Sequence, residues 1–100
     1  MVKFVIAFRQ PAQPDAFESA FQDFLALAER MPDLLRRQVL HVAGAPRGTA
    51  AYYRVLELYF QDQPTMQQAL WSAQGQEAGR ELGRFEPNTL EVFYGYVYEA

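Results

Sequence analysis

The chain has 100 residues, half of them hydrophobic and 15% aromatic, and its formal net charge is -3. This length supports one hydrophobic core, so we expect a single domain over residues 1–100, and the composition argues against disorder. The acidic balance, with no block of basic residues, disfavours nucleic-acid binding, which needs positive charge against phosphates.

The chain contains no cysteine, so disulfides and zinc sites with sulfur ligands are impossible. The apolar run from Phe4 to Phe8 is too short for a signal-peptide core, and no stretch approaches a transmembrane span. With one histidine, no spaced set of carboxylates and no glycine-rich phosphate loop, we expect neither a metal nor a cofactor. A cytoplasmic protein without membrane contact is the plain expectation.

Strand and helix signals alternate in the first half of the chain. The β-branched and aromatic run Val2 to Phe8 predicts a strand. Asp15 followed by Glu18 resembles a capping box and predicts the start of a helix that Pro32 ends. One face of this helix should be apolar, because hydrophobic residues recur at steps of three and four: Phe17, Phe21, Phe24, Ala28 and Met31.

The second half repeats the pattern. A strand is predicted at about 35–43, a turn at Gly44 to Gly48, and a further strand at Tyr52 to Phe60. Asp62 and Pro64 predict the start of a helix whose apolar period continues to about Phe85, although Gly75 and Gly79 weaken it. Residues 89–98 form the last predicted strand.

The predicted order is therefore βαββαβ, which is typical of an α+β, ferredoxin-like fold with an antiparallel four-stranded sheet and its helices on one face. Both faces of the predicted strands are apolar. On 52–60, Leu56 and Leu58 share one face, while Tyr53, Val55 and Tyr59 share the other. Two helices can cover only one face, so we expect a homodimer packed sheet against sheet.

The chain also resembles the EthD family of the dimeric α/β-barrel superfamily over nearly its whole length. The resemblance lies in the joint order of short segments, none of them specific alone. They are the opening strand with Lys3, 14–17 (PDAF), 31–34 (MPDL), 44–46 (GAP), 52–54 (YYR) with 57–58 (EL), and 72–76 (SAQGQ).

This resemblance implies a sheet-to-sheet dimer, a dimeric α/β barrel, with a pocket between each sheet and its helices. Related barrels include cofactor-free monooxygenases, muconolactone isomerase and haem-degrading enzymes. Many EthD-like proteins carry a histidine-x-proline on the first helix, where this chain has Phe24-Leu25-Ala26. Phenylalanine neither moves protons nor binds metals, so chemistry that needs that histidine should not be transferred here.

Two residues are weak catalytic candidates. Glu57, at mid-strand between apolar neighbours, could act as a general base, because burial raises the pKa of an unpaired carboxylate. The commoner outcome is a salt bridge, here to Arg9, Arg37 or Arg54. His41, the single histidine, could move a proton near neutral pH, but without a spaced partner it is more often a satisfied structural residue.

We expect the ligand pocket to be lined by Phe24, Tyr53, Trp71 and Tyr94. The tyrosines (Tyr52, Tyr53, Tyr59, Tyr94, Tyr96 and Tyr98) could orient a planar ligand or could fill the dimer interface. Trp71 is expected in the core or in the cavity wall.

Three functions follow from these residues. The first is a cofactor-independent catabolic enzyme, oxygenase-like or isomerase-like, acting on a small apolar or aromatic metabolite. The second is a non-catalytic small-molecule-binding or accessory dimer module, which the missing helix histidine favours. The third is a simple dimerisation domain, which would have no cavity beside Phe24 and Trp71.

Overall fold

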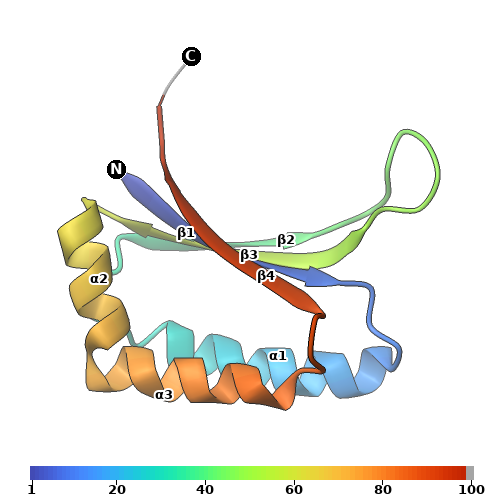
Figure 1. The fold of residues 1–100 in the computed structure, drawn as a ribbon, viewed down its shortest axis with the longest axis horizontal. Helices are drawn as coiled ribbons and strands as arrows, with labels where there is room; N and C mark the ends of the chain where they lie inside the picture. The colour runs from blue at the N-terminus through green and yellow to red at the C-terminus, as the bar shows by residue number, and fades with distance from the viewer. Residues whose placement is uncertain (99–100) are drawn as a thin grey trace.

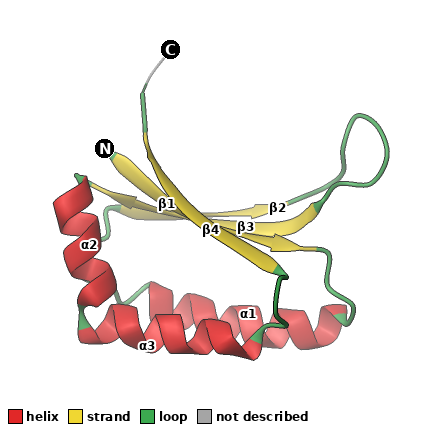
Figure 2. Ribbon diagram, viewed as in Figure 1, coloured by secondary structure: helices red, strands yellow, loops and turns green. Residues whose placement is uncertain are grey.

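The computed structural model describes residues 1–98. The helices all lie on one side of the sheet (Figure 1, Figure 2). The α+β, ferredoxin-like fold is confirmed, with two α-helices and a 3-10 helix in place of the single second helix that the sequence predicts. In chain order the elements are β1 (Val2–Arg9), α1 (Pro14–Ala28), β2 (Arg36–His41), β3 (Tyr52–Phe60), α2 (Gln63–Trp71), α3 (Ala73–Glu81), the 3-10 helix η1 (Leu82–Arg84) and β4 (Leu90–Tyr96).

The sheet has the strand order β2-β3-β1-β4, and neighbouring strands are antiparallel. Ile6 of β1 is opposite Leu56 on β3 and Val92 on β4. Side chains alternate along a strand, so this register places all three on the side of the sheet that faces the helices. The central strands β1 and β3 consequently carry most of the buried side chains.

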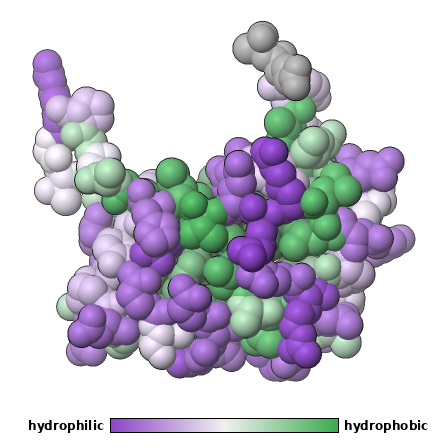
Figure 3. All heavy atoms as spheres, turned by 180° about the vertical axis from the view of Figure 1, so that it is seen from behind, coloured by the Kyte–Doolittle hydropathy of each residue, from purple (hydrophilic) through white to green (hydrophobic). Residues whose placement is uncertain are grey.

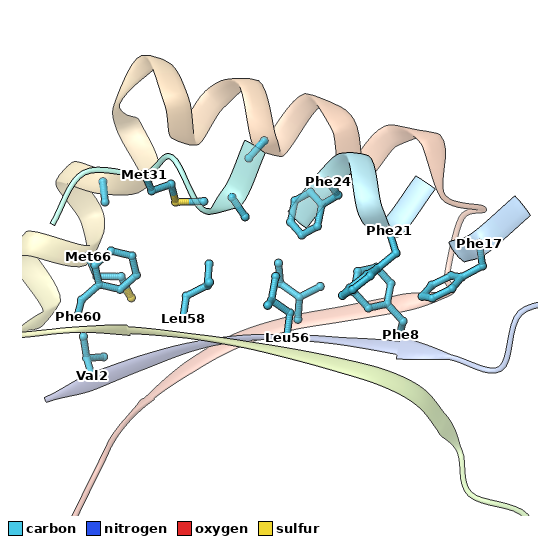
Figure 4. Close-up of a cluster of buried hydrophobic side chains, with 14 residues drawn as sticks. Val2, Phe8, Phe17, Phe21, Phe24, Met31, Leu56, Leu58, Phe60 and Met66 are labelled. Atoms are coloured by element: carbon cyan, nitrogen blue, oxygen red, sulfur yellow. The ribbon is translucent and has the colours of Figure 1, made fainter. Parts of the chain in front are cut away.

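Phenylalanine rings fill the space between α1 and the sheet. Phe17, Phe21 and Phe24 lie on one helical face because they recur at steps of four and three residues. Each is at most 7% exposed. Phe8 of β1 packs edge-on against all three, at centroid distances of 5.3, 5.6 and 6.5 Å (Figure 4). Burying one such ring contributes roughly 1.5 to 3 kcal/mol, so this layer holds α1 on the sheet.

The predicted capping box at the start of α1 is wrong. The helix begins at Pro14, its N-cap residue is Gln13, and no side chain accepts a hydrogen bond there. Proline suits the first helical position because it has no N–H to satisfy. Asp15 lies in the first turn, where the helix dipole favours a carboxylate, whereas Glu18 turns towards β3.

Several predicted element ends differ slightly from those of the structure. α1 ends at Ala28 rather than at Pro32, because the N–H groups of Arg30 and Met31 bond to carbonyls only three residues back. β2 and β4 are each shorter than their predicted ranges of 35–43 and 89–98. No helix within residues 1–98 is long and apolar enough to cross a membrane.

The long helix predicted to reach Phe85 is broken at Ser72, which is extended and separates α2 from α3. The Ser72 side chain accepts a hydrogen bond from the N–H of Gly75 at 3.1 Å and so caps α3. The two helices approach closely at this corner. A Cβ atom on Gly75 would lie 2.2 Å from the carbonyl oxygen of Ala69 and 2.5 Å from that of Leu70.

A β-bulge interrupts the pairing of β1 with β3. Phe8 is opposite Arg54 and Arg9 is opposite Tyr52, which leaves Tyr53 as the additional residue. Tyr53 and Arg54 therefore both contact α1. The predicted grouping of Tyr53 with Val55 and Tyr59 on one face of the sheet is wrong, because strict alternation cannot anticipate a bulge.

The side of the sheet away from the helices, the open face, has no cover within residues 1–98. Two large apolar side chains on it, Leu40 and Phe93, are each 54% exposed. By strand register its residues include Lys3, Val5, Ala7, Gln38, Leu40, Val55, Glu57, Tyr59 and Phe93.

Two segments extend on the side of this open face. The loop between β2 and β3 and the last described residues, 97–98, both rise away from the helices (Figure 1). Viewed from the β2 side, apolar surface lies beneath and between these two segments, next to a strongly polar patch (Figure 3). The open face therefore lies between two protruding segments, and its side chains are a mixture of apolar and polar residues.

Candidate functional site

A cavity of about 120 Å³ opens where the end of β1, the start of α1 and η1 meet. The rings of Phe8, Phe17 and Phe85 line it, with the Phe8 and Phe85 centroids 4.9 Å apart. Ala16 and Ala20 of α1 also line it, and their small side chains leave the space free. An apolar protein cavity of about 150 Å³ accepts a benzene ring. This cavity is smaller but open to solvent on one side, so a single ring is the largest group that it can hold.

Charged side chains also contribute to the lining. Arg84 donates through Nη1 to Asp23 Oδ2 at 2.6 Å and to Glu81. The hydrogen bond to Asp23, followed by that to Glu81, raises the pKa of Arg84. Its side chain is 45% exposed, so these ion pairs lie in contact with solvent.

A second hollow of about 270 Å³ lies between the α1–β2 connection and the start of α2. It has no aromatic lining and is mostly polar, so the smaller cavity is the better candidate for an apolar ligand. Its lining residues are Asp33, Leu34, Leu35, Gln61, Thr65 and Gln68.

An ion pair between a buried arginine and a partly exposed glutamate lies behind the wall of the first cavity. Arg54 is 4% exposed, and its two terminal nitrogens donate to the two carboxylate oxygens of Glu18, each at 2.9 Å. The guanidinium lies 5.5 Å from the Phe17 ring centre and 4.9 Å from that of Phe21. Its Nε has no acceptor within residues 1–98. Since Phe17 lines the cavity, this pair supports the cavity wall.

Tyr53 completes the arrangement by donating its hydroxyl to Glu18 at 2.9 Å. The hydrogen bond from Arg54 holds the pKa of Glu18 below its usual value, and the bond from Tyr53 adds to this. The same contact with Glu18 raises the pKa of Tyr53. Glu18 is therefore ionised and Tyr53 neutral at neutral pH, which is a structural arrangement rather than a proton relay.

A similar group occurs on the other side of the bulge. Tyr52 donates its hydroxyl to Glu91 at 2.9 Å, and Arg9 pairs with the same carboxylate. The Tyr52 hydrogen bond, followed by that of Arg9, lowers the pKa of Glu91. Two adjacent tyrosines thus bond to two different glutamates, one on α1 and one on β4.

Glu57 lies on the open face of the sheet, away from the aromatic cavity. Its carboxylate is 3.2 Å from Lys3 Nζ and 3.3 Å from the Tyr59 hydroxyl. The Tyr59 hydroxyl also lies 2.9 Å from Gln38 Oε1. The glutamate is therefore ion-paired, but its partner is Lys3 and not one of the three arginines expected from the sequence.

The remaining predicted site residues are not brought together. Phe24 is 1% exposed in the aromatic layer, whereas Tyr94 is 46% exposed on β4 and Trp71 is 75% exposed at the end of α2. The expectation that Trp71 lies in the core is wrong for a single chain. His41 is exposed at the end of β2, where it is opposite Arg54 on β3.

No three histidine, aspartate or glutamate side chains within residues 1–98 gather closely enough to hold a metal ion.

Sequence reasoning missed the residues that form the cavity. The sequence predicts only that Phe8 belongs to a strand and Phe85 to the end of a helix, and it predicts no role for Arg84. A usable signal was the pattern of alanines at 16 and 20 beside phenylalanines at 17 and 21, which leaves small residues at adjoining positions of α1. The cavity also depends on η1 folding back against α1, which this local pattern does not reveal.

A scan of protein-family profiles and a comparison with curated proteins find no match for the chain. The structure, however, superposes on the crystal structure of an ethyl tert-butyl ether D (EthD) family protein from Bacillus halodurans C-125. The TM-score is 0.92 and the sequence identity 27%, over 98% of this chain and 99% of that one. The chain is EthD-like, and the family resemblance predicted from the sequence is confirmed.

Two further structures share the fold at lower identity. A dimeric ferredoxin-like protein of unknown function from Thermobifida fusca YX matches with a TM-score of 0.71 and 12% identity, over 96% of this chain and 90% of that one. SnoaB, a cofactor-independent oxygenase from Streptomyces nogalater, matches with a TM-score of 0.68 and 22% identity, over 99% and 94%. These two structures show that other proteins share this fold, and a shared fold does not by itself imply a shared activity.

Proposed function

We propose that this protein is a homodimer that binds a small, largely apolar or aromatic molecule in the cavity between β1, α1 and η1. The observation that carries the proposal is the lining of that cavity. Three phenylalanine rings and two alanine methyl groups form the apolar part of its lining, beside polar side chains, and leave space of about the size of a single ring. Concave sites with apolar walls and few polar groups are typical of small-molecule binding.

Binding is a better match to this geometry than acid–base catalysis. By the sequence resemblance, Phe24 stands where many EthD-like proteins have a histidine, and its ring is part of the core. Of the two candidate proton carriers, Glu57 lies on the opposite face of the sheet and His41 lies at the exposed end of β2. Neither lines the cavity, and a general base must reach its proton within hydrogen-bonding distance.

A matched pair of variants on α1 tests the binding site. Ala20→Leu places a larger side chain in the cavity, and Ala26→Leu makes the same change at an exposed position of the same helix. A ligand that binds only the folded state raises the melting temperature. Phenol or toluene should therefore raise it in the wild type and in Ala26→Leu, but not in Ala20→Leu.

Ala16→Leu, which also narrows the cavity, provides a second test if Ala20→Leu folds poorly. An equal thermal shift in the wild type and in a folded cavity-filling variant would show that the ring binds elsewhere. No shift from any single-ring compound would overturn the proposal.

The dimer part of the proposal draws on the open face. Leu40 and Phe93 expose apolar side chains there, whereas the residues of the core on the other side of the sheet are buried. Apolar surface of this kind on a small protein is typical of an interface. The Thermobifida fusca protein of the same fold is dimeric. A second copy of the chain, packed sheet against sheet, would cover this surface.

A cofactor-independent enzyme is the second candidate, and the polar group on the open face favours it. Glu57 is close to both Lys3 and Tyr59, with its side chain 21% exposed. A second sheet over this group would shield it from water, which strengthens electrostatic effects. Glu57→Gln should then abolish conversion of a bound compound while the dimer persists. Unchanged turnover in Glu57→Gln would remove Glu57 from that role.

A further inference from the structure

The volume of the aromatic cavity limits what part of a ligand it can contain. At about 120 Å³ it has space for one ring and little else. Any substituent on that ring must therefore project towards the mouth, where solvent and the charged lining residues lie. The chemistry at the mouth then decides which substituent is favoured.

Arg84 lines the cavity and uses only part of its hydrogen-bonding capacity. Both of its hydrogen bonds, to Asp23 and to Glu81, leave from Nη1. Within residues 1–98, Nε and Nη2 have no acceptor. A guanidinium has five N–H donors, and the edge formed by Nε and Nη2 matches the two oxygens of a carboxylate.

The acidic groups around this residue, which are Asp23, Glu81 and the cavity-lining Glu86, compete with an anionic ligand for the guanidinium. The ion pair with Asp23 is exposed, with 45% of the Arg84 side chain and 58% of the Asp23 side chain accessible, whereas the Glu81 side chain is 24% exposed. Exposed pairs contribute little to stability, so a ligand can share the guanidinium without a large loss. Because the chain as a whole is negative, at -3, an anionic ligand needs such a local cation.

From these observations we propose that the cavity selects a monocyclic aromatic carboxylate, with its ring among Phe8, Phe17 and Phe85 and its carboxylate bound by Arg84. The inference rests on the proposed function, since it names the ligand class of the same cavity. Arg84 would touch the ligand and so determine specificity for the negative charge, while the phenylalanines supply affinity for any small ring.

The experiment compares benzoate with benzamide, a neutral molecule of the same shape, by calorimetric titration of the whole protein. Benzoate should bind more tightly than benzamide, by about threefold to tenfold for an added exposed charge-assisted contact. High salt should reduce this preference, because it screens exposed charges. Equal affinities for the two molecules would overturn the inference.

Two arginine substitutions that remove the same charge test whether the preference for benzoate comes from Arg84. Arg84→Gln should remove the preference for benzoate over benzamide. Arg80→Gln, four residues earlier on α3 and outside the cavity lining, should preserve it. Loss of the preference in both variants would indicate long-range electrostatics instead of a contact. A cooperative thermal unfolding transition like that of the wild type shows that Arg84→Gln still folds.

Asp23→Asn gives a test in the opposite direction. It removes one of the acidic partners of Arg84, so benzoate should bind more tightly, by about twofold to fivefold. A purely structural ion pair would produce no gain, and a loss would contradict the inference. If neither benzoate nor benzamide binds the wild type, the proposed function itself fails; if both bind equally, only the charge selectivity fails.

Discussion

Arg54 and Glu18 form an ion pair whose two members have different environments. Arg54 is 4% exposed at its side chain, whereas the Glu18 side chain is 39% exposed. Removing the glutamate would leave a buried charge without a partner, but removing the arginine would leave a carboxylate that water can solvate. The cost of breaking a buried pair depends on which charge is left unpaired.

We therefore predict an asymmetry between two variants. Glu18→Gln should destabilise the protein by about 3 kcal/mol, the typical cost of an unpaired buried charge. Arg54→Met keeps the apolar contacts with Phe17 and Phe21 and should cost about 1 kcal/mol. Urea unfolding measures both values. Equal costs, or a larger cost for Arg54→Met, would contradict the prediction.

The two glutamates with lowered pKa values predict how stability depends on pH. Arg54 lowers the pKa of Glu18, and Tyr52 lowers that of Glu91, below the value of 4.5 for an unperturbed carboxyl. The unfolded chain then binds protons more readily than the folded one. Their contribution to stability is complete above pH 4.5 and is lost as the pH falls through the lowered values.

The melting temperature should accordingly stay nearly constant at mildly acidic pH and decrease below pH 4.5. Glu91→Gln should make this decrease shallower, because the glutamine has no proton to gain. Thermal unfolding monitored by circular dichroism across this range provides the measurement. A decrease that is equally steep in Glu91→Gln would show that other carboxylates cause it.

At the scale of elements, the corner between α2 and α3 depends on a glycine that sequence reasoning treated as a weakness. Gly75 has backbone oxygens of Ala69 and Leu70 in the place where a Cβ would lie. Gly79, one turn later in the same helix, has nothing within 4 Å of that position. The same residue type is required at one position and replaceable at the other.

Gly75→Ala should destabilise the protein by about 2 kcal/mol or more, because backbone atoms cannot move aside without strain. Gly79→Ala should stabilise it by up to about 1 kcal/mol, the difference in helix propensity. Chemical denaturation of the two variants and of the wild type measures these differences in the free energy of unfolding. Stabilisation by both substitutions would mean that the close approach at the corner is absent.

At the scale of the whole molecule, the proposed dimer predicts different effects for two neighbouring residues of β4. Phe93 points to the open face and is 54% exposed, whereas Val92 points to the helix side and is 45% exposed. A lysine at 93 would bury its charge in a sheet-to-sheet interface, which is costly. A lysine at 92 would lie on the helix side of the sheet, outside that interface.

Phe93→Lys should therefore shift the protein from dimer to monomer, while Val92→Lys should leave the dimer intact. Analytical ultracentrifugation over a dilution series measures the dissociation constants. A wild type that sediments as a monomer at all concentrations would refute the sheet-to-sheet dimer. Equal weakening by both substitutions would place the interface elsewhere.

Element order, fold class and the main apolar faces could be read from residue patterns. The steps of three and four between Phe17, Phe21 and Phe24 predicted the buried side of α1, and the run 52–60 predicted the whole of β3. These are local features, because helix and strand periods depend on residues close together in the chain. The resemblance to the EthD family agreed with them.

The bulge at Tyr53, the break at Ser72 and the cavity beside η1 were not predictable in the same way. Each depends on segments far apart in the chain: β1 against β3, α2 against α3, and η1 against α1. Pairing register and close approach are set by how these segments pack, and no short residue pattern encodes them. Local periodicity was therefore enough for the fold and the apolar faces, whereas the position of the candidate site emerged only when distant segments packed together.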